Sequence, residues 1–332
     1  MLLLFAHLLT AALGVAAQYP ARPRAPGVAF RLTPDYGIAV IYFNDGTTVP
    51  VAQVHGSRQY RVFMRNNTAS ASTEDSMLCR FLPPALERLP PAFRPDLDIC
   101  RGTDFTSTKA LLATLKSAVE SYLGTNICFA GLSLDGVEEH TRDIAQEALQ
   151  ALGLRQVIPT VQPARYAVHA NRPDSEPAYD EDPWVVLAVD YSFHWFDVGV
   201  YTIDEIGLVL PVHSTVRGPR IGEENQLDAL RDTLNSLFAN PPPDFNLPAQ
   251  FRYLVVYGDD AKNETLHHML KDILGSDLVR DARVSSSVFD GMAFMAHVVH
   301  EHMDTIDFET QVESAFGCKW RSKLYPKDES EL

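Results

Sequence analysis

The sequence has little positive charge, few cysteines and, beyond its first residues, no long apolar run. Its 28 lysines and arginines are outnumbered by 43 acidic residues, and the formal net charge is -15. This balance argues against nucleic acid or an anionic membrane surface as the partner. The four cysteines form no Cys-x-x-Cys pair, and the neighbouring His267 and His268 lack an accompanying carboxylate pattern, so no metal site is predicted.

The first 17 residues, MLLLFAHLLTAALGVAA, are apolar and end in small side chains. This is typical of a secretory signal peptide cleaved after Ala17, followed by a linker over 18–26, although the usual basic residues at the start are absent. Two Asn-x-Thr triplets make Asn66 and Asn263 candidate glycosylation sites. We therefore expect a secreted or ER/secretory-pathway protein with no transmembrane segment after cleavage.

The even number of cysteines permits two disulfides in such an oxidising compartment. Cys79 and Cys100 flank one proline-rich segment and are the candidate first pair, and Cys128 and Cys318 remain for a second. The alternative is that all four are buried thiols.

The apolar pattern predicts the same order of elements twice. Three strands are followed by a helix, a strand, a helix, a short strand and a helix. In the first half (27–170), which contains a proline-rich insert at 65–103, these elements are expected at 28–32, 37–43, 47–54, 104–124, 127–134, 137–152, 155–159 and 162–170. In the second half (184–300), they are expected at 184–190, 195–203, 208–216, 222–238, 253–257, 263–274, 283–284 and 286–300.

A linker at 171–183 separates the halves, and 301–332 forms a C-terminal tail. A three-stranded meander followed by crossover helices gives a mixed sheet with helices on its faces. The predicted fold class is therefore α/β, with two lobes that each hold a mixed sheet flanked by helices. The closing helix at 286–300 is expected to pack back toward the first lobe.

Two segments carry a family resemblance. Residues 117–170 run as a helix, Tyr-Leu-Gly, a strand, a helix with an early arginine, Gly-Leu, a short strand and a helix begun by Gln-Pro-Ala. Residues 189–198, VDYSFHWFDV, are followed by Thr-Ile-Asp. In these segments the chain resembles the nucleotide-binding domain of seventy-kilodalton heat-shock chaperones. The resemblance implies a duplicated actin-like ATPase fold, with a cleft for ATP and Mg²⁺ between the lobes.

The same resemblance marks candidate cofactor-binding positions. Asp190 and Asp197 match the carboxylates that orient metal-bound and attacking water, so they are the vestigial catalytic candidates; the alternative is that they cap a turn and a strand end. Glu224 matches an acidic nucleotide-contacting motif, or else begins an ordinary helix. The full candidate set is Asp35, Tyr36, Asp190, Trp195, Asp197, Glu224 and Gly258.

The phosphate loops depart from the family pattern. A phosphate approaches the backbone closely only where glycine stands, because a Cβ clashes with it. Ser192, Phe193 and His194 replace three glycines, and Trp195 replaces a threonine. These replacements predict that the second loop no longer accepts a phosphate.

The first hairpin departs in the same way. Leu32 stands where the family has aspartate, and Pro34 where it has glycine. The family's catalytic lysine has no counterpart, since Lys109 is the first lysine of the chain, and Arg58 or Arg61 would have to supply that charge.

We therefore expect a pseudo-ATPase that acts as a non-catalytic binding or scaffold protein, with an unidentified protein partner and no required cofactor. The alternative is an altered cleft that binds ATP with Mg²⁺, by stacking on Trp195 or Tyr36, with little or no hydrolysis.

Overall fold

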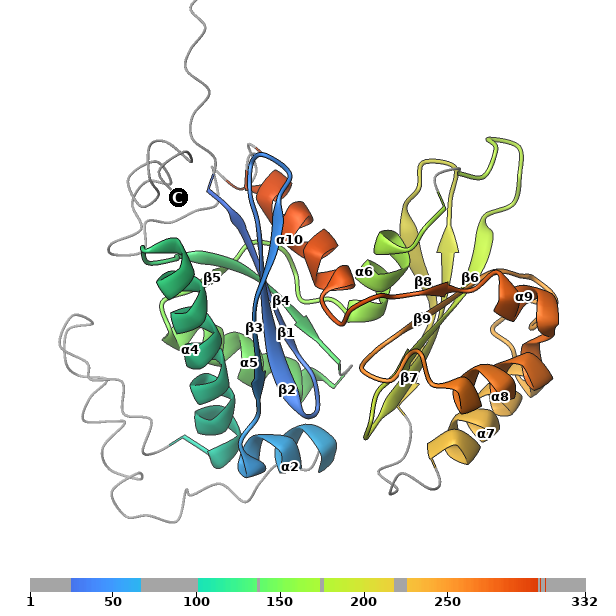
Figure 1. The fold of residues 1–332 in the computed structure, drawn as a ribbon, viewed down its shortest axis with the longest axis horizontal. Helices are drawn as coiled ribbons and strands as arrows, with labels where there is room; N and C mark the ends of the chain where they lie inside the picture. The colour runs from blue at the N-terminus through green and yellow to red at the C-terminus, as the bar shows by residue number, and fades with distance from the viewer. Residues whose placement is uncertain are drawn as a thin grey trace, which may run out of the picture.

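The computed structural model describes residues 25–66, 101–135, 138–173, 176–217, 226–303, 305 and 308. Within these ranges the chain forms two five-stranded mixed sheets, each flanked by helices, which gives two lobes side by side (Figure 1). The expected signal peptide, most of the proline-rich insert and most of the C-terminal tail lie outside the described residues.

The two sheets have the same topology. The first has the order β3-β2-β1-β4-β5, and the second, read from its far edge, has the equivalent order β8-β7-β6-β9-β10. In each, the first three strands are antiparallel and the last two join in parallel. The strands of the first sheet are β1 (Gly27–Leu32), β2 (Tyr36–Tyr42), β3 (Thr48–His55), β4 (Phe129–Leu134) and β5 (Arg155–Gln156). Those of the second are β6 (Trp184–Tyr191), β7 (Phe196–Ile203), β8 (Val209–Arg217), β9 (Phe251–Tyr257) and β10 (Arg283–Val284).

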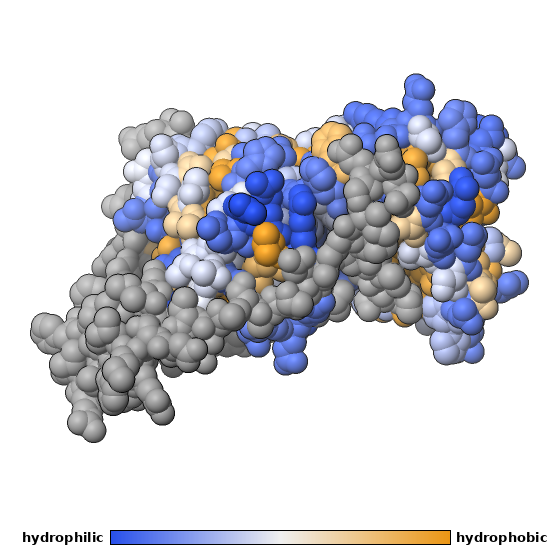
Figure 2. Space-filling model, turned by 90° about the horizontal axis from the view of Figure 1, so that it is seen from below, coloured by the Kyte–Doolittle hydropathy of each residue, from blue (hydrophilic) through white to orange (hydrophobic). Residues whose placement is uncertain are grey.

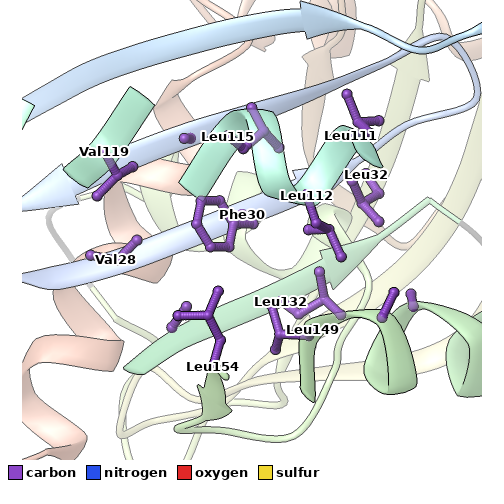
Figure 3. Packing of buried hydrophobic residues seen from close by; sticks show 14 of the residues in the cluster. Val28, Phe30, Leu32, Leu111, Leu112, Leu115, Val119, Leu132, Leu149 and Leu154 are labelled. Carbon is purple, nitrogen blue, oxygen red and sulfur yellow. The ribbon is translucent and has the colours of Figure 1, made fainter. Parts of the chain in front are cut away.

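The outer face of the first sheet packs against α4 (Thr103–Leu123) and α5 (Glu139–Ala151). Leu112, Leu115 and Val119 recur at helical spacing on α4 and are fully buried, which is why this segment forms a helix against the sheet. Figure 3 shows Phe30 of β1 between Leu115 and Val119 of α4 on one side and Leu132 of β4 on the other. The helix ends where Gly124 adopts a left-handed conformation with φ of 67°.

The corresponding face of the second sheet packs against α7 (Gln226–Ala239) and α8 (Glu264–Leu274). Leu230 and Leu234 of α7 and Leu266 and Leu270 of α8 are fully buried there. Both lobes therefore have the same arrangement of two helices over one face of a sheet.

The other faces of the sheets are covered by α6 (Pro163–Ala170) and α10 (Asp290–His302), which lie between the lobes in Figure 1. Met295 and Val299 of α10 pack on the first sheet. Ala167 of α6, by contrast, belongs to the core of the second sheet. The two helices cross closely at Gly291, where a Cβ would lie 3.1 Å from the backbone nitrogen of Ala167.

Two short helices are additions to the expected pattern, namely α2 (Arg58–Asn66) and α9 (Ser276–Arg280). The signal for α2 is present in the sequence, because Tyr60, Phe63 and Met64 have helical spacing and are buried. The expected strands and helices all have counterparts of the same type and order, although their ends differ by a few residues.

Hydrophilic side chains cover most of the described surface in Figure 2, and hydrophobic residues form small separated patches there. No helix in the described part of the chain is long and apolar enough to cross a membrane.

Candidate functional site

The turns that end β1 and β6 have the same geometry. In the first turn the Thr33 nitrogen donates to the Tyr36 carbonyl at 2.8 Å, and in the second the Ser192 nitrogen donates to the Trp195 carbonyl at 3.0 Å. Thr33 and Ser192 are therefore equivalent positions, as are Tyr36 and Trp195. A side chain from a following helix holds each turn, since Tyr60 Oη donates to the Thr33 carbonyl at 2.7 Å and Gln226 Nε2 to the Ser192 carbonyl at 2.6 Å.

The strand register extends this equivalence to Arg31 and Asp190. Arg31 lies opposite Ile38 on β2, and Asp190 lies opposite Asp197 on β7. The position equivalent to Asp190 is thus Arg31, whereas Leu32, which the resemblance matches to the family's first-hairpin aspartate, is equivalent to Tyr191. Successive side chains of a strand point to opposite faces of the sheet. A shift of one residue therefore replaces the apolar core residue Leu32 by the charged Arg31, which faces the other lobe.

Equivalent residues of the two turns contact each other across the lobes. We call this region the hairpin junction, which comprises residues 31–36 and 190–195 together with Arg65, Asp135 and Asp259.

The first contact of the hairpin junction is a buried ionic triad. Arg31 donates from Nε and Nη2 to the two carboxylate oxygens of Asp135, at 2.8 and 2.7 Å, and from Nη2 to Asp190 Oδ2 at 2.5 Å. The side chain of Arg31 is 3% exposed, and both carboxylates are fully buried. Charges removed from water in this way are tolerated only when they are paired and hydrogen-bonded.

The charges of the triad do not cancel, because one guanidinium faces two carboxylates. Burial raises the pKa of Asp190, and Asp135 raises it further, while Arg31 and a 3.0 Å bond from Ser192 Oγ act in the lowering direction. Burial opposes the charge of Arg31, but the two carboxylates outweigh it and raise its pKa. Arg31 therefore stays a cation and holds the two acidic side chains together.

Gly258 makes room for this triad. It follows β9 with a φ of 111°, a conformation that L side chains rarely adopt. A Cβ at this position would collide with the Asp190 carboxylate and the Tyr191 carbonyl oxygen. Gly258, a candidate cofactor-binding residue, therefore serves here to admit a side chain of the protein itself.

The second contact joins Asp35 and His194, which are also equivalent positions. His194 Nδ1 lies 2.7 Å from Asp35 Oδ2, and Arg65 of α2 forms an ion pair with the other oxygen of the same carboxylate. Asp35 is buried, whereas the side chain of His194 is 48% exposed, so this contact lies at the rim of the hairpin junction.

The third contact joins Tyr36 and Trp195, whose ring centroids are 5.9 Å apart. Both rings are almost fully buried, and Tyr36 Oη donates to Asp259 Oδ1 at 2.7 Å. Burial raises the pKa of Tyr36, so the phenol keeps its proton and remains a donor. The two aromatic side chains fill the space between the turns and pack against each other.

The structure thus brings most of the candidate residues together. Asp35, Tyr36, Asp190 and Trp195 form the contacts described above, and Gly258 lies beneath them. Asp197 is buried next to this group on β7, opposite Asp190 in the ladder. Glu224 lies outside the described residues.

Sequence reasoning missed the cations that balance these acids. Arg58 and Arg61 are exposed on α2, and the charge comes instead from Arg31 and Arg65. The sequence does mark Arg31 as a candidate buried cation, because it is the one charged residue in the apolar run GVAFRL of β1. Asp135, which follows β4, had no comparable signal.

The candidate modification sites are only partly described. Asn66 ends α2, and Asn263 caps α8, where its Oδ1 accepts from the Leu266 nitrogen at 3.1 Å and its Nδ2 donates to Asp260 at 2.7 Å. Glycosylation at either site remains a prediction. Cys128 is buried and disulfide-bonded.

The remaining cysteines, Cys79, Cys100 and Cys318, lie outside the described residues, so both proposed pairings stay predictions. In the described part of the chain, no group of three or more His, Cys, Asp or Glu side chains is placed to hold a metal ion.

Neither family models nor curated proteins match this sequence. A functional inference therefore depends on the hairpin junction and its chemistry.

Proposed function

We propose that this chain is a non-catalytic binding or scaffold protein, built on an actin-like frame that resembles heat-shock-70 chaperones, in which the nucleotide cleft is closed by the protein's own side chains. The duplicated sheet order and the crossing of α6 and α10 support this frame. The observation that carries the proposal is the position of Arg31 between Asp135 and Asp190.

Phosphoryl transfer requires carboxylates that are available to a metal ion and backbone N–H groups that a phosphate can reach. Here the carboxylates of Asp135 and Asp190 already bind a guanidinium, and Tyr36 and Trp195 occupy the space between the two turns. Uncoupling a buried ion pair costs about 3–5 kcal/mol. A nucleotide entering at this point would therefore bind at least about a hundredfold more weakly than in an open site.

A thermal-shift titration tests the proposal. We expect no change in melting temperature when ATP with Mg²⁺ is added to millimolar concentration, because a ligand stabilises a protein only if it binds the folded state. Phosphate release should also equal the background of an Asp190→Asn variant. A rise in melting temperature, or turnover that Asp190→Asn abolishes, would contradict the proposal and favour the nucleotide-binding alternative.

We also propose that the protein acts in the secretory pathway. The apolar N-terminus and the disulfide at Cys128 support this placement, since disulfides persist in oxidising compartments. The mature protein should begin at Gln18, and its glycosidase-sensitive mass should decrease in a Thr265→Ala variant, which removes one acceptor triplet but keeps the Asn263 cap. A mature N-terminus at Met1 in a cytosolic protein would overturn this placement.

A further inference from the structure

A pocket of about 220 Å³ lies between the two lobes and shares no lining residue with the hairpin junction. From the first lobe it is lined by Arg142 of α5 and by the segment that leads into α6. From the second lobe it is lined by Tyr201 of β7 and Pro211 of β8. It would therefore remain a separate site whatever the hairpin junction binds.

The described lining of this pocket is positively charged. Arg142 and Arg165 both line it, and none of the described lining residues carries a carboxylate. The described lining thus carries two positive charges in a chain whose net charge is -15. Arg165 is half-buried and makes no ion pair with another described residue, so its guanidinium is available to a ligand.

The positive field of Arg165 reaches its buried neighbours. Burial raises the pKa of the Tyr201 phenol and Asp197 raises it further, while Arg165 acts in the lowering direction. Burial also lowers the pKa of His169, and Arg165 adds to that effect. Tyr201 therefore remains a protonated phenol that adds no negative charge to the pocket, and its hydroxyl donates to Gln162 Oε1 at 3.4 Å.

The start of α6 adds to this preference for anions. Gln162 is the N-cap of α6, its side chain makes no capping bond, and both Gln162 and Thr160 line the pocket. Pro163 at the first position of α6 has no N–H, but the N–H groups of the residues that follow it have no partner within the helix, and such groups favour a negative charge nearby. The guanidinium groups of Arg142 and Arg165 and the Thr160 hydroxyl lie beside the start of α6. Together they form the donor set of an oxyanion site.

The volume limits the size of the ligand. It corresponds to about seven water molecules and is smaller than the roughly 300 Å³ at which drug-sized pockets begin. Apolar walls from Leu134 and Val161 leave room for a short carbon chain. We propose that this pocket binds a small oxyanion, a carboxylate or a phosphate group, through Arg142 and Arg165.

Isothermal titration calorimetry on the purified full chain tests the proposal, with inorganic phosphate and succinate as separate probes and sodium chloride of equal ionic strength as the reference. Saturable binding of either probe supports the proposal, and the probe that binds more tightly distinguishes a tetrahedral from a carboxylate head. Neither probe saturating at millimolar concentration would overturn it.

Variants tie the binding to the pocket. Arg165→Gln and Arg142→Gln should each weaken affinity about tenfold or more, because each removes a charge-assisted hydrogen-bond donor. Arg280→Gln, which removes an exposed arginine from α9, should leave affinity unchanged. If a glutamine variant unfolds, Arg165→Lys keeps the charge but loses the forked geometry, and it should also weaken binding. Equal affinities in the wild type and the folded pocket variants would reject the assignment.

Discussion

Arg31 and Asp190 occupy equivalent positions in the two halves of the chain, and their side chains are joined by a 2.5 Å bond. Where two similar hairpins pack face to face, a residue of one hairpin lies close to the residue at the equivalent position of the other. Two aspartates at such a place would repel each other. Opposite charges at one pair of positions, and Asp35 with His194 at another, allow the hairpins to close on each other instead.

Arg31→Met should lower the free energy of unfolding by about 3–5 kcal/mol, because it leaves Asp135 and Asp190 buried without a cation. Chemical denaturation measures this change. The matched control is Arg280→Met, which breaks exposed ion pairs and should change stability by about 1 kcal/mol or less. Equal effects of the two substitutions would show that the triad does not hold the lobes together.

The two acids of the triad should differ in importance. Asp135 accepts two bonds from Arg31, whereas Asp190 accepts one and is the surplus negative charge. At neutral pH, Asp135→Asn should therefore cost about 3 kcal/mol, while Asp190→Asn should cost about 1 kcal/mol or less because it leaves a neutral pair. Unfolding curves of the two variants under identical conditions decide this order, and the reverse order would contradict it.

Gly258→Ala should be strongly destabilising for two reasons, its φ of 111° and the collision with Asp190. Gly124→Ala is the matched control, because that glycine has a φ of 67° and nothing within 4 Å of its added Cβ. Backbone strain alone costs about 1–2 kcal/mol, so we expect Gly258→Ala to exceed the control by at least about 2 kcal/mol. Melting temperatures that fall equally would remove the role given to Gly258.

Stability should decrease in mild acid through His169. Burial lowers the pKa of this imidazole from its ordinary value near 6.5 to about 4, with Arg165 and Arg172 adding to the effect. The ring is stacked on Phe294 with centroids 4.8 Å apart. Because the unfolded chain binds this proton more readily, the stabilising contribution is complete above about pH 6.5 and is lost as the pH falls toward 4.

The comparison that isolates His169 is a His169→Phe variant, which keeps an aromatic ring against Phe294 but does not titrate. Its melting temperature should fall less than that of the wild type between pH 6.5 and 4. Parallel profiles for the two proteins would show that His169 is not responsible.

The sequence predicted the elements well and the contacts between the lobes poorly. Strands such as β1 and helices such as α4 follow from local periodicity, which is a property of neighbouring residues. The pairing of Arg31 with Asp190 depends on how two distant hairpins face each other, which no local pattern contains. The equivalence of Asp190 with Arg31 rather than Leu32 is hard to predict for a similar reason, since a shift of one residue in a turn leaves the apolar pattern nearly unchanged while it reverses every face.

The crossing of α6 and α10 has a consequence for how the chain folds. Each half contributes its last helix to the sheet of the other half, as a domain-swapped dimer does between two molecules. A fragment ending at residue 173 would leave its own sheet without α10, and a fragment beginning at 176 would lack α6. Neither half is then a self-sufficient folding unit, and separately produced halves should gain stable structure only when they are mixed.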